Sequence, residues 1–164
     1  MSASKIAIGF MHVLAKLPLP VLRGLGKLVG RVLFVVAGQR RRIALRNFEL
    51  CFPDVPEVQR KAWAKESFEV FCQTFLDRSW LWFGSEELVR SRVKLVGATH
   101  ELEGDTPTIV FAPHFYSMDA GGLALPLNTE REFTSIFATN PDPVLDAWFM
   151  AGRQRFGDVR MLNR

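Results

Sequence analysis

The sequence predicts an α/β protein in which a helical, basic amphipathic N-terminal portion is followed by the start of a mostly parallel sheet with crossover helices. Three observations support this class. Apolar residues recur with helical spacing in the first third of the chain, and the pattern becomes strand-like near Val93. From there to Arg164, strand-like and helix-like segments alternate, as in sheets joined by right-handed crossovers. The chain of 164 residues is long enough for one core of ordinary size.

Charge is distributed unevenly along the chain. Residues 1–50 contain nine Lys and Arg against one acidic residue, a net charge of +8, whereas residues 51–164 contain 12 basic and 16 acidic residues, a net charge of −4. A basic end indicates an anionic partner, which could be a membrane surface or a nucleic acid. The hydrophobic composition of 48%, with fourteen Phe and four Trp, favours the membrane.

The N-terminal segments are predicted to be amphipathic, membrane-associating helices that occupy residues 1–38. Residues 20–37 place leucines and valines on one side of a helical wheel and Arg23, Lys27 and Arg31 on the other. Such a helix can lie in the headgroup plane with its cations on anionic lipid phosphates. Packing on the protein's own core is the alternative. The uncharged runs are too short to span a bilayer, so we expect a peripheral or monotopic anchor.

The remaining elements follow from turn signals and periodicity. A second helix is expected at residues 39–50, and Asp54 with Glu57 resembles a capping box that opens a third helix ending near Gly84. Further along the chain we expect strands at residues 93–96, 108–112, 133–137 and 159–162, and helices at residues 98–103, 118–125 and 144–156.

His114 and Asp119 are the candidate catalytic residues. The run 108–112 should be a buried strand that ends at Pro113, which places His114 at a strand-to-helix bend, where open α/β sheets carry their chemistry. Asp119 should fall in the first turn of the next helix and hydrogen-bond one ring nitrogen, leaving the other to deprotonate a hydroxyl. A polar histidine beside an aspartate favoured by the helix dipole is the structural alternative.

Other chemistries receive little support from the sequence. Cys51 and Cys72 are too few and too far apart for a metal cluster, so we expect no metal site, and free thiols. The sequence contains no Walker A loop, dinucleotide-binding glycine motif or serine nucleophile elbow. A nucleic-acid partner is not expected, because aromatic residues are not interleaved with the basic cluster of residues 40–46.

Two sequence blocks resemble a known family. Residues 40–53, RRRIALRNFELCFP, and residues 114–119, HFYSMD, are similar to the bacterial lipid A biosynthesis late acyltransferases, the lauroyl- and myristoyl-transferring enzymes of the lysophospholipid acyltransferase superfamily. The segment 140–153 is similar to the next block of that family, and the resemblance runs from about Leu14 to Arg164.

The resemblance implies a glycerolipid acyltransferase-like fold and a defined reaction. A fatty acyl chain would pass from a thioester of acyl carrier protein or coenzyme A to a hydroxyl of a membrane lipid, a lipid A precursor, as a step of lipopolysaccharide biosynthesis. His114 would be the general base and Asp119 its orienting partner, and no cofactor is implied. Because a thioester needs no further activation, positioning and a basic imidazole would account for much of the chemistry, and backbone N–H donors or a cation would stabilise the oxyanion. The protein would lie at the cytoplasmic face of the cell inner membrane.

The chain departs from the family pattern in two places. Relatives commonly carry an aromatic-Arg-Pro triplet where this chain has residues 137–139, FAT, so Arg153 or Arg155 is the candidate for contacting an anionic substrate group. Solvated surface arginines are the alternative. Relatives run to nearly twice this length, so we expect residues 39–164 to be the N-terminal half of an acyltransferase domain, truncated after the sheet begins. A non-catalytic, membrane-binding remnant is therefore the alternative function.

Overall fold

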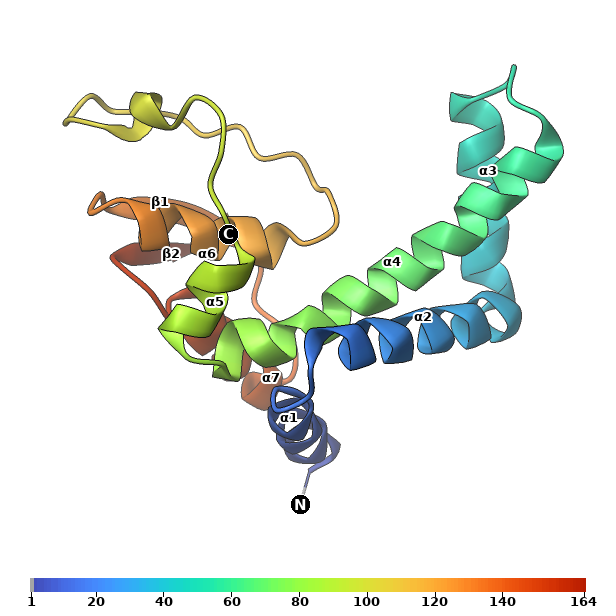
Figure 1. The fold of residues 1–164 in the computed structure, drawn as a ribbon, viewed down its shortest axis with the longest axis horizontal. Helices are drawn as coiled ribbons and strands as arrows, with labels where there is room; N and C mark the ends of the chain where they lie inside the picture. The colour runs from blue at the N-terminus through green and yellow to red at the C-terminus, as the bar shows by residue number, and fades with distance from the viewer. Residues whose placement is uncertain (1) are drawn as a thin grey trace. The chain divides into compact units, whose positions relative to one another are not determined.

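The computed structural model describes residues 2–164 as a mostly helical chain with a small parallel sheet near its C-terminus (Figure 1). This arrangement confirms the predicted class. The chain divides into two compact units, residues 17–77 and residues 1–16 with 78–164. In chain order the elements are α1 (Ala3–Leu14), α2 (Leu19–Val36), α3 (Gly38–Cys51), α4 (Glu57–Phe83), α5 (Glu86–Arg92), the 3-10 helix η1 (Thr99–Leu102), α6 (Met118–Asn128), β1 (Phe133–Phe137), α7 (Pro143–Arg153) and β2 (Val159–Asn163).

In the unit formed by residues 17–77, α2 packs closely along α4. A Cβ atom added at Gly30 would lie 2.5 Å from the Cα atom of Glu69, and one added at Gly26 would lie 2.7 Å from the Cα atom of Gln73. These two glycines are spaced by four residues, so they lie on one face of α2 and let the two backbones approach each other. The predicted second helix is confirmed as α3.

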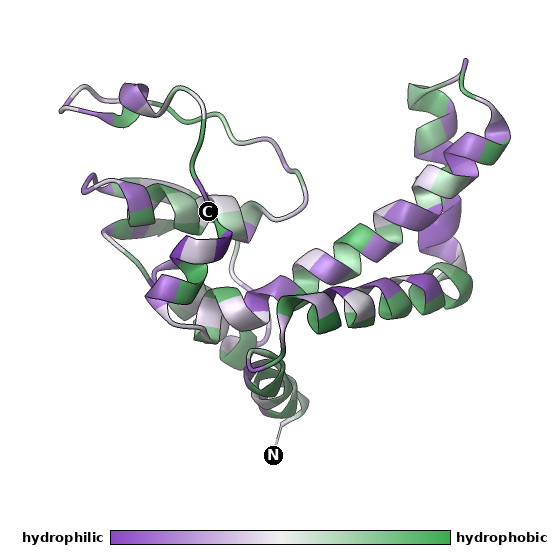
Figure 2. Cartoon of the chain, in the orientation of Figure 1, coloured by the Kyte–Doolittle hydropathy of each residue, from purple (hydrophilic) through white to green (hydrophobic). Residues whose placement is uncertain are grey.

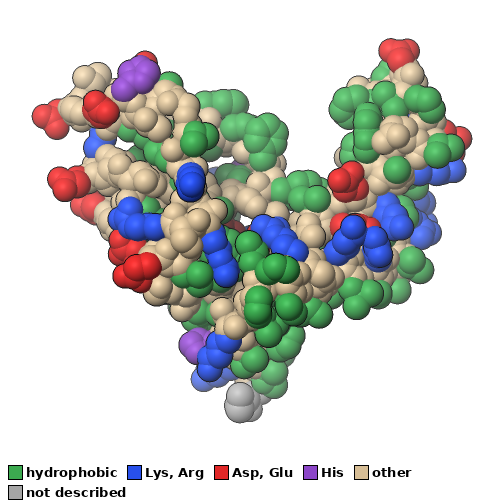
Figure 3. Space-filling view, in the orientation of Figure 1, with side chains coloured by type: hydrophobic (Ala, Val, Ile, Leu, Met, Phe, Trp, Pro, Cys, Tyr) green, Lys and Arg blue, Asp and Glu red, His purple; other side chains and the backbone are tan. Residues whose placement is uncertain are grey.

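The basic stripe of α2 faces α4. Arg23 pairs with Asp77 at 2.9 Å, and Glu69 pairs with both Arg31 at 2.8 Å and Lys27 at 3.7 Å. The amphipathic helix is confirmed, but its three cations have carboxylate partners within the protein and do not form a free stripe. The side of α2 away from α4 carries the aliphatic side chains, as Figures 2 and 3 show; the exposed ones are Val21, Leu25, Leu28, Val29, Val32, Val35 and Val36.

The connection between α3 and α4 is an aromatic corner. The rings of Phe48 and Phe52 lie 6.1 Å and 5.4 Å from that of Trp63, measured between centroids. The guanidinium of Arg60 donates to the carbonyl of Phe52. Helix α4 begins at Glu57, so Asp54 lies in the preceding turn and the predicted capping box is wrong.

The C-terminal part of the second unit contains the sheet. Strands β1 and β2 pair in parallel, with Phe133 opposite Val159 and Phe137 opposite Asn163, and α7 forms the connection between them. Asp142 caps α7, because its side chain accepts hydrogen bonds from the backbone N–H groups of Val144 and Leu145. The predictions for both strands and for the crossover helix are confirmed.

Helices from distant parts of the chain form the core of this unit. Its buried side chains are Met11, Leu14, Trp80, Leu81, Trp82, Val89, Leu123, Ala124, Leu127 and Phe156. Arg155 closes the end of α4 by donating to the carbonyls of Leu81, at 2.8 Å, and Gly84. Burial lowers the pKa of the Arg155 guanidinium, and Glu86 partly opposes this shift. Arg155 therefore has a structural role at a helix terminus.

Two predicted strands are wrong. Residues 93–96 and 108–112 are not strands, and residues 98–103 contain only the 3-10 helix η1. Ile109 and Phe111 are 97% and 88% exposed. Their apolar, β-branched and aromatic sequence suits a buried strand, but within residues 2–164 the sheet pairs β1 with β2 alone, and a strand forms only where a neighbour satisfies its backbone groups.

The length and apolar content of the helices also bear on the predicted anchor. Within residues 2–164, none of the helices combines the length and the apolar content that crossing a membrane requires. The predicted division into a membrane-associating segment, 1–38, and a catalytic region, 39–164, concerns function and remains a prediction.

Candidate functional site

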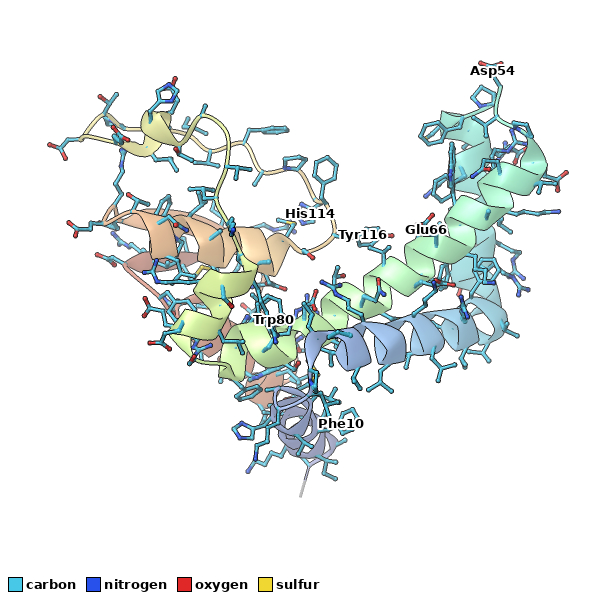
Figure 4. All side chains as sticks on the ribbon, viewed as in Figure 1. Phe10, Asp54, Glu66, Trp80, His114 and Tyr116 are labelled. Atoms are coloured by element: carbon cyan, nitrogen blue, oxygen red, sulfur yellow. The ribbon has the colours of Figure 1, made fainter. Side chains whose placement is uncertain are left out.

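His114 lies at the tip of a tight turn just before α6. The backbone N–H of Phe115 donates to the carbonyl of Pro113 at 2.7 Å, which makes His114 the central residue of a three-residue turn. Figure 4 shows His114 on the extended segment that leads into α6, and its side chain is exposed. The predicted bend is therefore present, although the strand expected before it is absent.

Ser117 reverses the chain between His114 and Asp119. It has φ 65° and ψ 26°, and it is the only residue other than glycine with a positive φ in the described chain. The left-handed region is unfavourable for a residue with a Cβ atom and often occurs at functional turns. The turn ends in α6, whose first turn contains Asp119, as the sequence predicts.

Two arginines hold the Asp119 carboxylate. Its Oδ2 atom accepts a hydrogen bond from the Nε of Arg78 at 2.7 Å, and its Oδ1 atom accepts one from the Nε of Arg153 at 3.2 Å. The side chains of Asp119, Arg78 and Arg153 are 11%, 22% and 36% exposed. The carboxylate is thus well shielded from water, and the three charges leave the cluster with a net charge of +1.

Aromatic rings support this charged cluster. The guanidinium of Arg78 lies 5.6 Å from ring centroids of Trp82 and of Phe149, and that of Arg153 lies 5.5 Å from Phe149. Trp82 packs directly on Gly152, where an added Cβ atom would overlap the indole ring. The end of α4 and the helix α7 are therefore closely fitted beneath the arginines.

The structure brings together two of the three predicted site residues. Asp119 and Arg153 form an ion pair, whereas the His114 ring makes no hydrogen bond or ion pair with any described residue. Sequence reasoning missed Arg78. One signal could have found it, because Asp77 and Arg78 are charged residues within an otherwise apolar stretch of α4, and charges in such stretches are usually paired.

The cluster retains hydrogen-bonding capacity. A carboxylate offers about four lone-pair positions, and the arginines use two of those on Asp119. Asp119 can therefore accept a further hydrogen bond from an imidazole N–H. Among residues 2–164, no group of three or more His, Cys, Asp and Glu side chains is arranged to hold a metal ion.

The chain matches a known protein family over nearly its whole length. Residues 3–164 match the family model described as bacterial lipid A biosynthesis acyltransferase. The chain belongs to this family. This match confirms the resemblance inferred from residues 40–53 and 114–119.

Individual members of the lipid A acyltransferase family are similar over most of this chain. It is 30% identical to a lipid A biosynthesis acyltransferase of Haemophilus influenzae over 151 residues, which cover 90% of this chain and 48% of the relative. It is 24% identical to the lipid A biosynthesis lauroyltransferase of Escherichia coli over 162 residues, 97% of this chain and 52% of that enzyme. It is 28% identical to the lipid A biosynthesis myristoyltransferase of the same organism over 141 residues, which cover 84% of this chain and 42% of that enzyme.

The chain thus spans about half the length of the curated relatives that it matches. No solved structure gives a significant match to it.

Proposed function

We propose that this protein transfers a fatty acyl chain from an acyl thioester to a hydroxyl group of a membrane lipid. Membership of the lipid A acyltransferase family supports this reaction type. Relatives of this chain are lauroyl-, myristoyl- and palmitoleoyltransferases of lipid A biosynthesis. We take the acceptor to be a lipid A precursor and the donor to be acyl carrier protein or coenzyme A thioester, at the cytoplasmic face of the inner membrane.

In the proposed reaction His114 is the general base. One ring nitrogen removes the proton from the acceptor hydroxyl as its oxygen attacks the thioester carbonyl, and the thiolate leaves as the carbonyl re-forms. Asp119 accepts a hydrogen bond from the other ring nitrogen and fixes the tautomer. The observation that carries this assignment is the position of Asp119, in the first turn of α6 and five residues beyond the exposed turn of His114.

Arg78 and Arg153 have a second role in this proposal. They keep the Asp119 carboxylate in place, and their excess positive charge attracts the phosphate groups that a lipid A precursor carries. Arg153 is the more exposed of the two, so we assign it the contact with the anionic substrate group.

Acyl transfer by His114→Ala tests the proposal. With an acyl carrier protein thioester and a lipid A precursor, His114→Ala should lower the transfer rate by at least about a hundredfold, the usual contribution of general base catalysis. His100→Ala is the matched control, because His100 is an exposed histidine on η1. Equal, measurable rates for the wild-type protein and His114→Ala would contradict the catalytic assignment. Vesicle binding with no transfer by either protein would favour the membrane-binding remnant.

A further inference from the structure

Three cationic side chains of residues 17–77 line one hollow. The cations of α2 are paired with Glu69 and Asp77. The hollow, with a volume of about 510 Å³, is formed by α2, α3 and α4 and is lined by Phe34, Arg41, Leu45, Val58, Lys61, Ala62 and Lys65. The atoms that line it are almost all apolar, although three of the lining residues are cationic.

The cations of this hollow differ in how firmly they are held. Arg41 donates to the carbonyls of Phe34, at 3.2 Å, and Val35, at 3.3 Å, and its guanidinium lies 5.7 Å from the Phe34 ring centroid. Lys61 pairs only with Glu57, one helical turn away, and both side chains are exposed. Lys65 forms no ion pair or hydrogen bond with any residue that the structure describes. Arg41 is thus fixed in place, while the charge of Lys65 is unneutralised.

This combination selects an amphipathic anion. A small hydrophilic anion gains nothing from the apolar floor, and a neutral hydrocarbon gains nothing from the cations. The hollow also adjoins the C-terminal end of α2, where Val35 and Val36 continue the exposed aliphatic side of that helix. An apolar surface that ends in a cationic hollow is complementary to the edge of a bilayer leaflet, where acyl chains meet anionic headgroups.

We propose that this hollow binds the headgroup of an anionic phospholipid. The phosphate lies between Lys65 and Arg41, with Lys61 beside it, and the first carbons of the acyl chains cover Leu45 and Val58. Charge recognition of the membrane then resides at the corner of α2, α3 and α4, and the paired cations along α2 take no part in it. This inference goes beyond the proposed acyl transfer, because it requires neither a donor nor an acceptor.

Vesicle binding tests the charged part of the proposal. Binding of the full chain is measured on phosphatidylcholine vesicles with and without phosphatidylglycerol. The double variant Lys61→Gln, Lys65→Gln should lose about tenfold in affinity for the anionic vesicles, since each basic residue near a charged surface contributes a factor of several. The matched control is Lys94→Gln, Arg160→Gln, which removes two exposed cations from the other unit. Equal binding by wild type and the first variant, or an equal loss in both variants, would overturn the proposal.

A second pair of variants tests the apolar part. Val58→Asn should weaken binding to the anionic vesicles, whereas Val96→Asn should not, and the two valines are 81% and 82% exposed, so neither substitution affects folding through burial. Equal effects of Val58→Asn and Val96→Asn would contradict a lipid site.

Soluble ligands separate the lipid from other occupants. Monomeric dihexanoyl phosphatidylglycerol should shift the backbone amide NMR signals of Arg41, Val58 and Lys65, and inorganic phosphate at the same concentration should not. Equal shifts with phosphate would replace the lipid by a simple anion. Self-association that disappears in Lys61→Gln, Lys65→Gln would replace it by a second copy of the chain. If the protein binds anionic vesicles through this hollow but transfers no acyl group, the proposed function is contradicted and the lipid site is not.

Discussion

The two residues of the candidate dyad lie in opposite surroundings. Asp119 is held by two arginines over closely packed aromatic rings, and its helix α6 contributes the buried Leu123 and Leu127 to the core. His114 lies on an extended segment, residues 105–116, whose side chains are exposed. Within the six residues of this motif, the chain therefore passes from an exposed segment with few contacts to a helix that packs in the core.

The largest expected difference concerns packing. Leu123→Ala should lower the free energy of unfolding by about 3 kcal/mol, because Leu123 is fully buried and its truncation leaves a cavity. Phe111 is exposed, so Phe111→Ala should change the free energy of unfolding by less than about 0.5 kcal/mol. Urea denaturation of both variants measures these values. Truncations in a core typically cost about 2 kcal/mol or more. A loss of that size for Phe111→Ala would show that the 105–116 segment is packed in solution.

The two residues of the dyad should also differ in how much they contribute to stability. Asp119→Asn should destabilise the protein by about 1–2 kcal/mol, because it leaves two partly buried guanidinium groups without their carboxylate. His114→Asn should have an effect below about 0.5 kcal/mol, since the exposed ring has no hydrogen-bond partner among the described residues. Thermal and urea unfolding distinguish these outcomes. Equal destabilisation would mean that His114 is bound to Asp119 in the folded protein.

Local sequence signals predicted the elements whose partners are close in the sequence. The strands β1 and β2 form a parallel pair, the intervening α7 is its crossover helix, and Asp142 marks the start of α7 as a helix cap. The same signals failed for residues 108–112. Alternation and β-branched residues report that a segment suits a strand, but only a neighbouring strand can supply the hydrogen bonds, and such a neighbour is not encoded in the segment itself.

The candidate site was predictable to a similar extent. The position of Asp119 in the first turn of α6 follows from the helix start near Ser117, which is a local property. Its ion pair with Arg78 joins residues 41 positions apart and depends on how α4 packs on α6 and α7. In the same way, the periodicity of α2 predicted its two faces but not that its cations would find carboxylates on α4. Pairing over long separations is determined by packing, which a single sequence does not reveal.

A weaker effect is expected from Asp142, whose carboxyl should make the stability of the protein depend on pH. Asp142 caps α7, the helix that ends in Arg153. A hydrogen bond from the Ser4 hydroxyl, together with those from the backbone N–H groups of Val144 and Leu145, holds the pKa of the Asp142 carboxyl below its ordinary value of 3.8. A carboxyl whose pKa is lowered on folding adds stability above its ordinary pKa, and this stability is lost as the pH falls through the lowered value.

Asp142→Asn isolates that titration, because asparagine caps a helix nearly as well as aspartate but carries no charge. The variant should be less stable than the wild-type protein near neutral pH, and the difference should shrink as the pH falls below about 4, where the wild-type carboxyl becomes protonated. Urea denaturation at several pH values measures the difference, with Asp105→Asn, an exposed position on the segment before His114, as the control. If the stability difference between wild type and Asp142→Asn is constant at every pH, the hydrogen bonds to Asp142 do not lower the pKa of its carboxyl. The charge of Asp142 would then not stabilise α7, the helix that carries Arg153 and so positions the partner of Asp119.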